Sequence, residues 1–162
     1  MVLSMSERSS FEEQLRVHGR IIYTNVGNSM MPLIKEGRDV LIIERHSGRL
    51  SKYDIPLYLR PDGQYVLHRI IRVYEDSYVT AGDNRSCRET VSDTQIVGVL
   101  TGIIRRGKTL SLDRLPYRIY THLWCDLFPI RAFIIRWRDR IRSVPARIAR
   151  LSDRKNKPTG KT

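Results

Sequence analysis

The sequence contains few cysteines: Cys87 and Cys125 are the only two, they are 38 positions apart, and neither belongs to a C-x-x-C pair. This scarcity favours free thiols in a reducing compartment over a disulfide framework or a zinc site. The four histidines are scattered as well, so the sequence indicates no cluster of metal ligands. No metal or cofactor is therefore implied.

Long apolar runs are also missing. Residues Met1–Ser10 lack the apolar region of a secretory signal, and no stretch approaches the ~20 apolar residues that span a bilayer. The best candidate, Ile119–Ile135, is interrupted by Asp126, Pro129 and Arg131. We therefore expect the protein to be made and kept inside the cell, either in the cytoplasm or peripherally on the inner face of the membrane.

Charge of one sign is concentrated in one part of the chain. Residues 1–113 carry 16 basic and 14 acidic side chains, whereas residues 114–162 carry 13 basic and 3 acidic ones, a net charge of +10 for this tail. Such a tail suits nucleic acid, an anionic membrane face or an acidic peptide. The basicity thus belongs to the tail and not to the preceding region.

The 162 residues suggest one domain with extensions. An N-terminal extension, 1–19, includes a helix predicted over Phe11–His18, which Gly19 ends. A domain over 20–113 contains short β-type runs separated by turn residues, which predicts a mainly β fold with a coiled or barrel-like sheet. These runs are Arg20–Val26, Asp39–Glu44, Ile55–Leu59, Tyr65–Val73, Tyr78–Ala81, Ile96–Ile104 and Thr109–Leu112.

The tail, 114–162, predicts a basic amphipathic helix over 130–142 followed by a disordered end, Ser152–Thr162. Pro129 is placed to open the helix. Its apolar residues recur at helical spacing, with arginines largely off that stripe; the apolar set is Ile130, Phe133, Ile134, Trp137 and Ile141. Two interpretations remain open: the stripe docks on the β domain, or the helix attaches the protein peripherally to an anionic membrane.

Three short segments contain residue types suited to nucleophilic catalysis. Ser29 lies in a turn bracketed by Gly27 and Pro32, His68 lies on an apolar strand, and Asp83 lies in a Gly-Asp-Asn corner. A serine hydroxyl needs a neighbouring base, and that base needs a third group to orient it. We therefore assign Ser29 as nucleophile, His68 as general base and Asp83 as orienting carboxylate, with Asp93 as a weaker alternative to Asp83.

These segments resemble the catalytic boxes of type I signal peptidases, in the subgroup whose base is histidine, as in archaea and the endoplasmic reticulum. The likeness covers about Ile21–Ile104 and rests on a G-x-S-M-x-P box at 27–32, a histidine box at 68–70 and a Gly-Asp-Asn box at 82–84. It departs from the family at Tyr53-Asp54-Ile55-Pro56, where the family has Gly-Asp followed by two β-forming residues, and no N-terminal membrane anchor is predicted. The resemblance implies a serine endopeptidase acting on an extended leader, signal or precursor peptide with small residues before the scissile bond.

Other interpretations of the same residues stay open. Ser29 can be an ordinary turn serine, His68 a core histidine and Asp83 a hairpin aspartate. The chain can also be an inactive family member that only binds peptides. A nucleic-acid-binding regulator of the self-cleaving repressor type is a further alternative, disfavoured because such proteins use a Ser/Lys pair, which the run Tyr65–Tyr74 lacks, and because 1–20 is too short for their DNA-binding motif.

Overall fold

Two antiparallel sheets form the body of the molecule. The structure, a computed structural model, describes residues 5–24, 26–112, 115–138, 140 and 141. Its elements are the helices α1 (Met5–His18), η1 (Asp93–Gln95) and α2 (Leu115–Asp126), and the strands β1 (Arg20–Thr24), β2 (Asp39–Glu44), β3 (Pro56–Leu59), β4 (Tyr65–Leu67), β5 (Arg69–Val73), β6 (Ser77–Ala81), β7 (Glu89–Ser92), β8 (Ile96–Arg105) and β9 (Lys108–Ser111).

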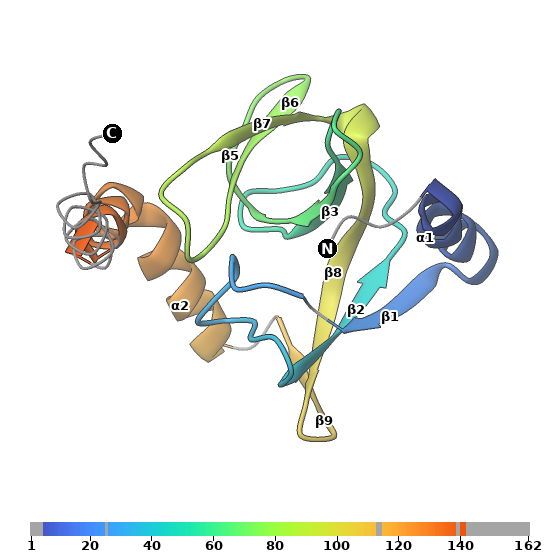
Figure 1. Ribbon diagram of the computed structural model, residues 1–162, viewed down its shortest axis with the longest axis horizontal. Coiled ribbons are helices and arrows are strands. Elements are labelled where there is room, and N and C mark those ends of the chain that lie inside the picture. The colour runs from blue at the N-terminus through green and yellow to red at the C-terminus, as the bar shows by residue number, and fades with distance from the viewer. Residues whose placement is uncertain (1–4, 25, 113–114, 139, 142–162) are drawn as a thin grey trace, which may run out of the picture.

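The larger sheet has the strand order β1-β2-β8-β3-β4, with β9 paired to β8, and the smaller sheet has the order β5-β6-β7. Long β8 bridges β2 and β3, and register shifts on both pairings help the sheet to curl. Figure 1 shows the resulting half-barrel, with α1 and α2 on opposite sides of the strands. This arrangement confirms the predicted mainly β, coiled-sheet fold with helices at both ends of the chain.

The main core follows from alternation along the strands. In β2 every second residue is buried, so Asp39, Leu41 and Ile43 point inward. The larger cluster of buried residues contains Met30, Ile34, Leu41, Ile43, Ile55, Leu57, Leu100 and Ile103. Because Met30 and Ile34 flank the turn after Ser29, the core fixes the position of the serine-bearing loop.

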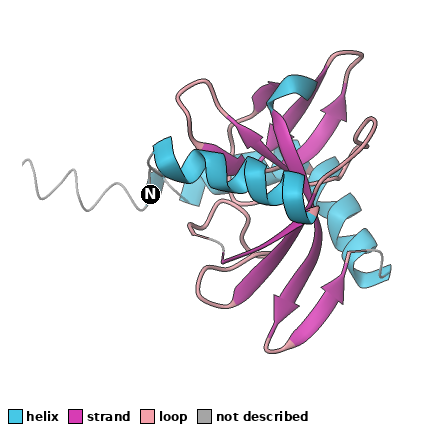
Figure 2. Ribbon diagram, turned by 90° about the vertical axis from the view of Figure 1, so that its right-hand side faces the viewer, coloured by secondary structure: helices cyan, strands magenta, loops and turns pink. Residues whose placement is uncertain are grey.

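Helix α1 lies across the curled sheet and faces the viewer in Figure 2. Leu15 is its buried anchor, and Phe11 packs against Tyr23 and Tyr65, with ring centroids 5.3 and 5.2 Å away. The helix begins earlier than the predicted Phe11, but it ends where expected. Gly19 has a φ of 71° and donates its N–H to Leu15 O, which is the backbone geometry that favours glycine after a helix.

The strand predicted over Tyr65–Val73 is wrong as a continuous element, because it breaks at His68. Strand β4, before His68, pairs with β3 in the larger sheet, whereas β5, after His68, pairs with β6 in the smaller one. His68 therefore sits at the crossing between the two sheets. The sequence pattern also missed β7, which pairs with β6.

The C-terminal helical region begins at Leu115, well before the predicted start at Pro129. Residues 128–138 continue it as a second helical segment, connected by the bond from Arg131 N to Leu127 O. Phe128 and Ala132 pack on Ala81. The docking face is thus not the predicted apolar stripe, because Ile130, Phe133, Ile134, Trp137 and Ile141 are all exposed.

No helix in the described ranges is both long enough and apolar enough to cross a membrane. The disordered end predicted for Ser152–Thr162 lies outside the described residues.

Candidate active site

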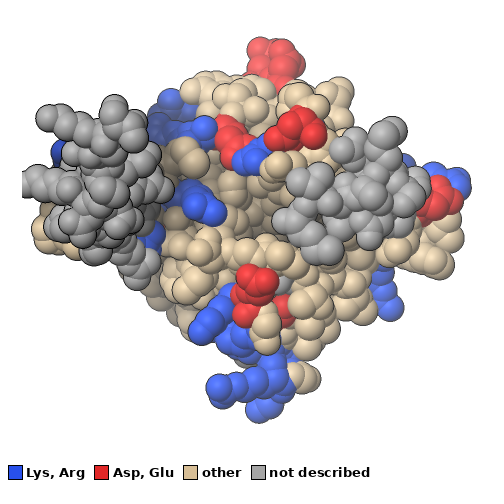
Figure 3. Space-filling view, viewed as in Figure 1, with Lys and Arg blue, Asp and Glu red and all other residues tan. Residues whose placement is uncertain are grey.

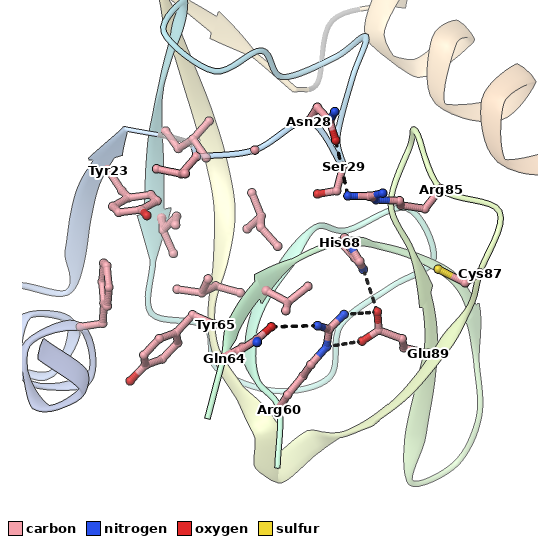
Figure 4. Close-up of a pocket in the computed structure, with 18 residues that line it drawn as sticks. Tyr23, Asn28, Ser29, Arg60, Gln64, Tyr65, His68, Arg85, Cys87 and Glu89 are labelled. Carbon is pink, nitrogen blue, oxygen red and sulfur yellow. Dashed lines mark hydrogen bonds and ion pairs between the residues drawn. The ribbon is translucent and has the colours of Figure 1, made fainter. Parts of the chain in front are cut away.

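A pocket of about 510 Å³ lies between the loop that carries Ser29 (the serine loop), the junction of β4 and β5, and the chain leading into β7. Ser29 and His68 both line it, as Figure 4 shows, and so do Arg60, Arg85 and Glu89. Its far end is apolar and is closed by Phe11, Tyr23, Leu57 and Tyr65. Two of the three residues predicted from the sequence therefore share one pocket.

The serine loop is held from both sides. Gly27 adopts a φ of 96°, which favours glycine, and it donates its N–H to Glu36 Oε2 at 3.0 Å. Ser29 itself is half-buried, and its carbonyl accepts the N–H of Asn84 at 2.7 Å. The Asn84 side chain donates in turn to Asn28 O at 3.2 Å. The Gly-Asp-Asn corner thus fixes the serine loop through Asn84.

Ser29 and His68 approach each other across Gly82. A Cβ atom placed on Gly82 would lie 2.7 Å from the backbone carbonyl oxygen of Ser29 and 3.1 Å from His68 Nε2, so the backbone at Ser29 and the His68 ring both lie close to Gly82. Glycine is the residue that allows this close approach. Within the described residues, the Ser29 hydroxyl and the His68 ring form no direct hydrogen bond.

The other ring nitrogen of His68 faces a buried polar network. Its Nδ1 lies 3.2 Å from the Tyr58 hydroxyl and 3.6 Å from Glu89 Oε1. Tyr58 donates its one proton to Glu89 Oε2 at 2.9 Å, so its oxygen can only accept from His68. His68 Nδ1 therefore carries the proton, and Nε2, on the Ser29 side, has the free lone pair.

Electrostatics keep His68 neutral. Burial lowers the pKa of His68 to about 4, although the neighbouring Glu89 charge acts in the opposite direction. Burial raises the pKa of Glu89, but the hydrogen bonds from Arg60 and Tyr58 outweigh it, and the pKa of Glu89 lies below its ordinary value. At neutral pH the site thus holds a neutral imidazole beside an ionised carboxylate.

The predicted contact between Asp83 and His68 is wrong. Asp83 is fully buried, and its two carboxylate oxygens accept hydrogen bonds from Arg69 at 2.9 and 2.8 Å. The Tyr120 hydroxyl donates to Asp83 Oδ2 at 2.9 Å, and Trp124 Nε1 donates to Asp83 O at 2.8 Å. Asp83 therefore connects the start of β5 to helix α2. It affects the position of His68 only through Arg69, which follows His68 in the chain.

Asp93, the alternative orienting group, is also remote from His68. Its carboxylate accepts hydrogen bonds from the Tyr78 hydroxyl and from Arg49 at the outer end of the smaller sheet. The carboxylate next to His68 is that of Glu89, which sequence reasoning missed. The strand pairing β6–β7 places Glu89 opposite Thr80, and Thr80 donates to the Tyr58 hydroxyl at 3.3 Å.

The departure from the signal peptidase pattern at Tyr53 has a backbone consequence. Tyr53 has a φ of 84°, a conformation that glycine adopts freely and that costs other residues about 1 kcal/mol or more. Hydrogen bonds from the Tyr53 hydroxyl to Asp126, at 3.0 and 3.1 Å, connect this strained turn to α2. The tyrosine therefore adds a helix contact that glycine would lack.

In the part of the chain that the structure describes, no group of three or more His, Cys, Asp or Glu side chains gathers as metal ligands would.

The chain matches no protein-family model, and neither the curated proteins nor the solved structures compared with it give a significant match. The resemblance to signal peptidases therefore rests on the three sequence boxes alone.

Proposed function

We propose that this protein is a serine endopeptidase in which Ser29 attacks a peptide carbonyl and His68 takes its proton. The observation that supports this most is the state of His68: its ring is neutral, its Nδ1–H faces Tyr58 and Glu89, and its Nε2 lies beside Gly82, next to the Ser29 backbone, in a pocket that Ser29 also lines. A nucleophile, a base and an orienting carboxylate are the parts that acyl transfer requires.

In the first step, Nε2 accepts the Ser29 proton while the hydroxyl oxygen bonds to the substrate carbonyl carbon. The imidazolium that forms is stabilised by Glu89 through Nδ1–H, and it then protonates the departing amine. Water repeats the sequence on the acyl-serine and releases the second product. A direct hydrogen bond between the Ser29 hydroxyl and His68 Nε2 is expected to form as substrate binds, because catalytic hydrogen bonds commonly tighten only in the substrate complex.

The substrate class follows from the walls of the pocket. Strand β4 is an edge of the larger sheet, and its residues Val66 and Leu67 line the pocket immediately before His68. An extended peptide can pair with such an edge and place its carbonyl at the catalytic groups. This edge supports an extended peptide as the substrate, and we propose that it is a leader, signal or precursor peptide cut at the inner membrane face or in the cytoplasm.

The test is a cleavage screen with the purified full-length protein. A peptide library made by digesting a whole proteome is incubated with the wild-type protein and with Ser29→Ala, and mass spectrometry identifies new termini. We expect new termini that share a sequence preference and that are absent with Ser29→Ala. Termini that are the same for both proteins, or none from either, would contradict the proposal and support a non-cleaving peptide-binding protein.

The pH dependence of cleavage should report the burial of His68. Only the neutral imidazole accepts the serine proton, so the rate should fall as the pH drops through about 4 and should be flat near neutrality. A midpoint near 6.5, the ordinary pKa of histidine, would show instead that the base is solvated. Rates are measured on a selected peptide, with circular dichroism at each pH to show that the fold persists.

Gly82→Ala should damage the site more than the fold. The new methyl would overlap Ser29 O at 2.7 Å and push the serine loop away from His68. A displacement of about 1 Å can cost on the order of 100-fold in rate, while overpacking costs about 1–3 kcal/mol of stability. Kinetics and a thermal melt measure both effects.

Gly102→Ala is the matched control for this substitution. It adds the same methyl in buried β8, but the nearest atom is the flexible Cδ1 of Ile42, at 3.2 Å. Equal rate losses in the two variants would show that Gly82 has no special role in allowing the serine loop and His68 to lie close together.

A further inference from the structure

The C-terminal helical region is apolar on two faces, of which only one is covered. The covered face packs on the β domain; its buried residues are Thr121, Cys125, Phe128, Arg131, Ala132 and Ile135, of which Arg131 is the one charged side chain. A helix that merely docks on a domain needs one apolar face, with polar residues opposite. The second apolar face therefore requires its own explanation.

The second face is continuous over α2 and 128–138 and extends to residue 141. We call it the exposed stripe; it consists of Leu115, Ile119, Leu123, Leu127, Ile130, Phe133, Ile134, Trp137 and Ile141, which are 46–71% exposed. Apart from Phe133, next to Ile134, successive members are three or four residues apart, so at ~100° per residue they share one side within each of the two helical segments. Exposed apolar surface of this extent marks an interaction site.

Basic side chains border the exposed stripe. Arg118, Arg136 and Arg140 fall along one edge of it at helical spacing, and all three are exposed. Figure 3 shows several Lys and Arg side chains on the left part of one face of the molecule. Apolar residues with Trp and Phe at the centre and arginines at the edge suit the boundary between acyl chains and anionic headgroups.

The helices are rigidly connected to the catalytic pocket. Tyr120 and Trp124 donate to Asp83, and Arg138 donates to Asn84 Oδ1 at 2.9 Å. Asn84 is the residue that holds Ser29 O. When the exposed stripe binds a surface, the pocket is therefore held at a fixed position relative to that surface.

We propose that the exposed stripe and its arginine edge form a docking surface for an anionic phospholipid bilayer, on which residues 115–141 lie flat. A second copy of the chain is a poorer occupant, since antiparallel pairing of two stripes would place their arginine edges side by side. The docking surface does not depend on catalysis, so its failure and the failure of the proposed peptidase activity are distinguishable.

The test uses the full-length Ser29→Ala protein and flotation with two kinds of vesicle. One kind contains phosphatidylcholine and phosphatidylglycerol in equal parts, and the other contains phosphatidylcholine alone. We expect strong binding to the first kind only. Phe133→Ser and Trp137→Ser should each weaken it about tenfold or more, and Arg118→Gln and Arg136→Gln about fivefold each.

Ile22→Thr is the matched control, because Ile22 on β1 is as exposed as Trp137, at 63%, but lies outside the stripe. The Ile22→Thr variant should bind the anionic vesicles as strongly as the parent protein does. All variants should melt at nearly the same temperature, because the changed residues are exposed. Equal binding to both kinds of vesicle, or unchanged binding by Trp137→Ser, would overturn the proposal. So would a stable dimer in sedimentation that Trp137→Ser dissociates.

Discussion

Ser29→Ala and His68→Ala should each slow cleavage of a selected peptide by on the order of 10⁶-fold, because nucleophile and base act as one unit. For the same reason, the double variant should be no slower than either single one. Single-turnover kinetics on the three proteins measure this. Losses that multiply in the double variant, or substantial activity in His68→Ala, would show that another group removes the Ser29 proton.

Glu89→Gln tests the orienting carboxylate in the same assay. Glutamine keeps the shape but removes the charge that stabilises the imidazolium, so we expect a loss of up to about 10⁴-fold. Asp83→Asn is its matched comparison, because it also removes one carboxylate charge near His68, but the Asp83 carboxylate accepts its hydrogen bonds from Arg69 and Tyr120 rather than from His68. A folded Asp83→Asn protein that is slower than Glu89→Gln would return the orienting role to Asp83.

Asp83→Ala should lower the free energy of unfolding by about 3–5 kcal/mol, the range for breaking a buried ion pair by removing one partner. The Arg69 and Asp83 side chains are 0% and 1% exposed, so the arginine left behind would stay charged in the core. The hydroxyl of Tyr120 would lose its acceptor as well. Urea denaturation, followed by circular dichroism, measures the change.

Asp126→Ala is the matched control for this stability prediction. Asp126 also connects α2 to the β domain, through Lys52 at 2.7 Å, but both side chains are nearly half exposed. Exposed ion pairs contribute about 0–1 kcal/mol. A similar loss of stability in Asp83→Ala and Asp126→Ala would mean that burial of the Arg69–Asp83 pair contributes nothing.

Local patterns were sufficient to predict most of the strands. Alternation in Asp39–Glu44 and the apolar run Ile96–Ile104 give β2 and β8 because one side of each faces the core. The break at His68 was not predictable in this way. Strand-forming residues stand on both sides of His68, and only the pairing of β4 with β3 and of β5 with β6 separates the two strands.

The candidate site was predictable where short motifs determine it and not where pairing does. The short motifs around Ser29 and His68 predicted that these residues lie together, and both line one pocket. The motif around Asp83 predicted a contact with His68, but the carboxylate next to His68 is that of Glu89. Glu89 reaches His68 because β7 folds back on β6, and strand β7 was not predicted. Recognising a strand in Glu89–Ser92 would have suggested this carboxylate.

The C-terminal helices show a different limit. Helical spacing predicted the stripe from Ile130 to Ile141, but a stripe alone does not tell which surface covers it. The structure shows a second apolar face, including Phe128 and Ala132, that packs on the domain. Spacing identified the helix, whereas the docking face depended on long-range contacts with Ala81.

The role of Ser29 as nucleophile is tested most directly by the mass of the protein during turnover. Purified wild-type protein is mixed with a cleaved peptide, quenched in acid and weighed intact by mass spectrometry, with Ser29→Ala as control. We expect a species heavier by the amino-terminal product less one water, with the added mass on Ser29. Cleavage that continues at the wild-type rate in Ser29→Ala, without such an adduct, would contradict the proposed mechanism.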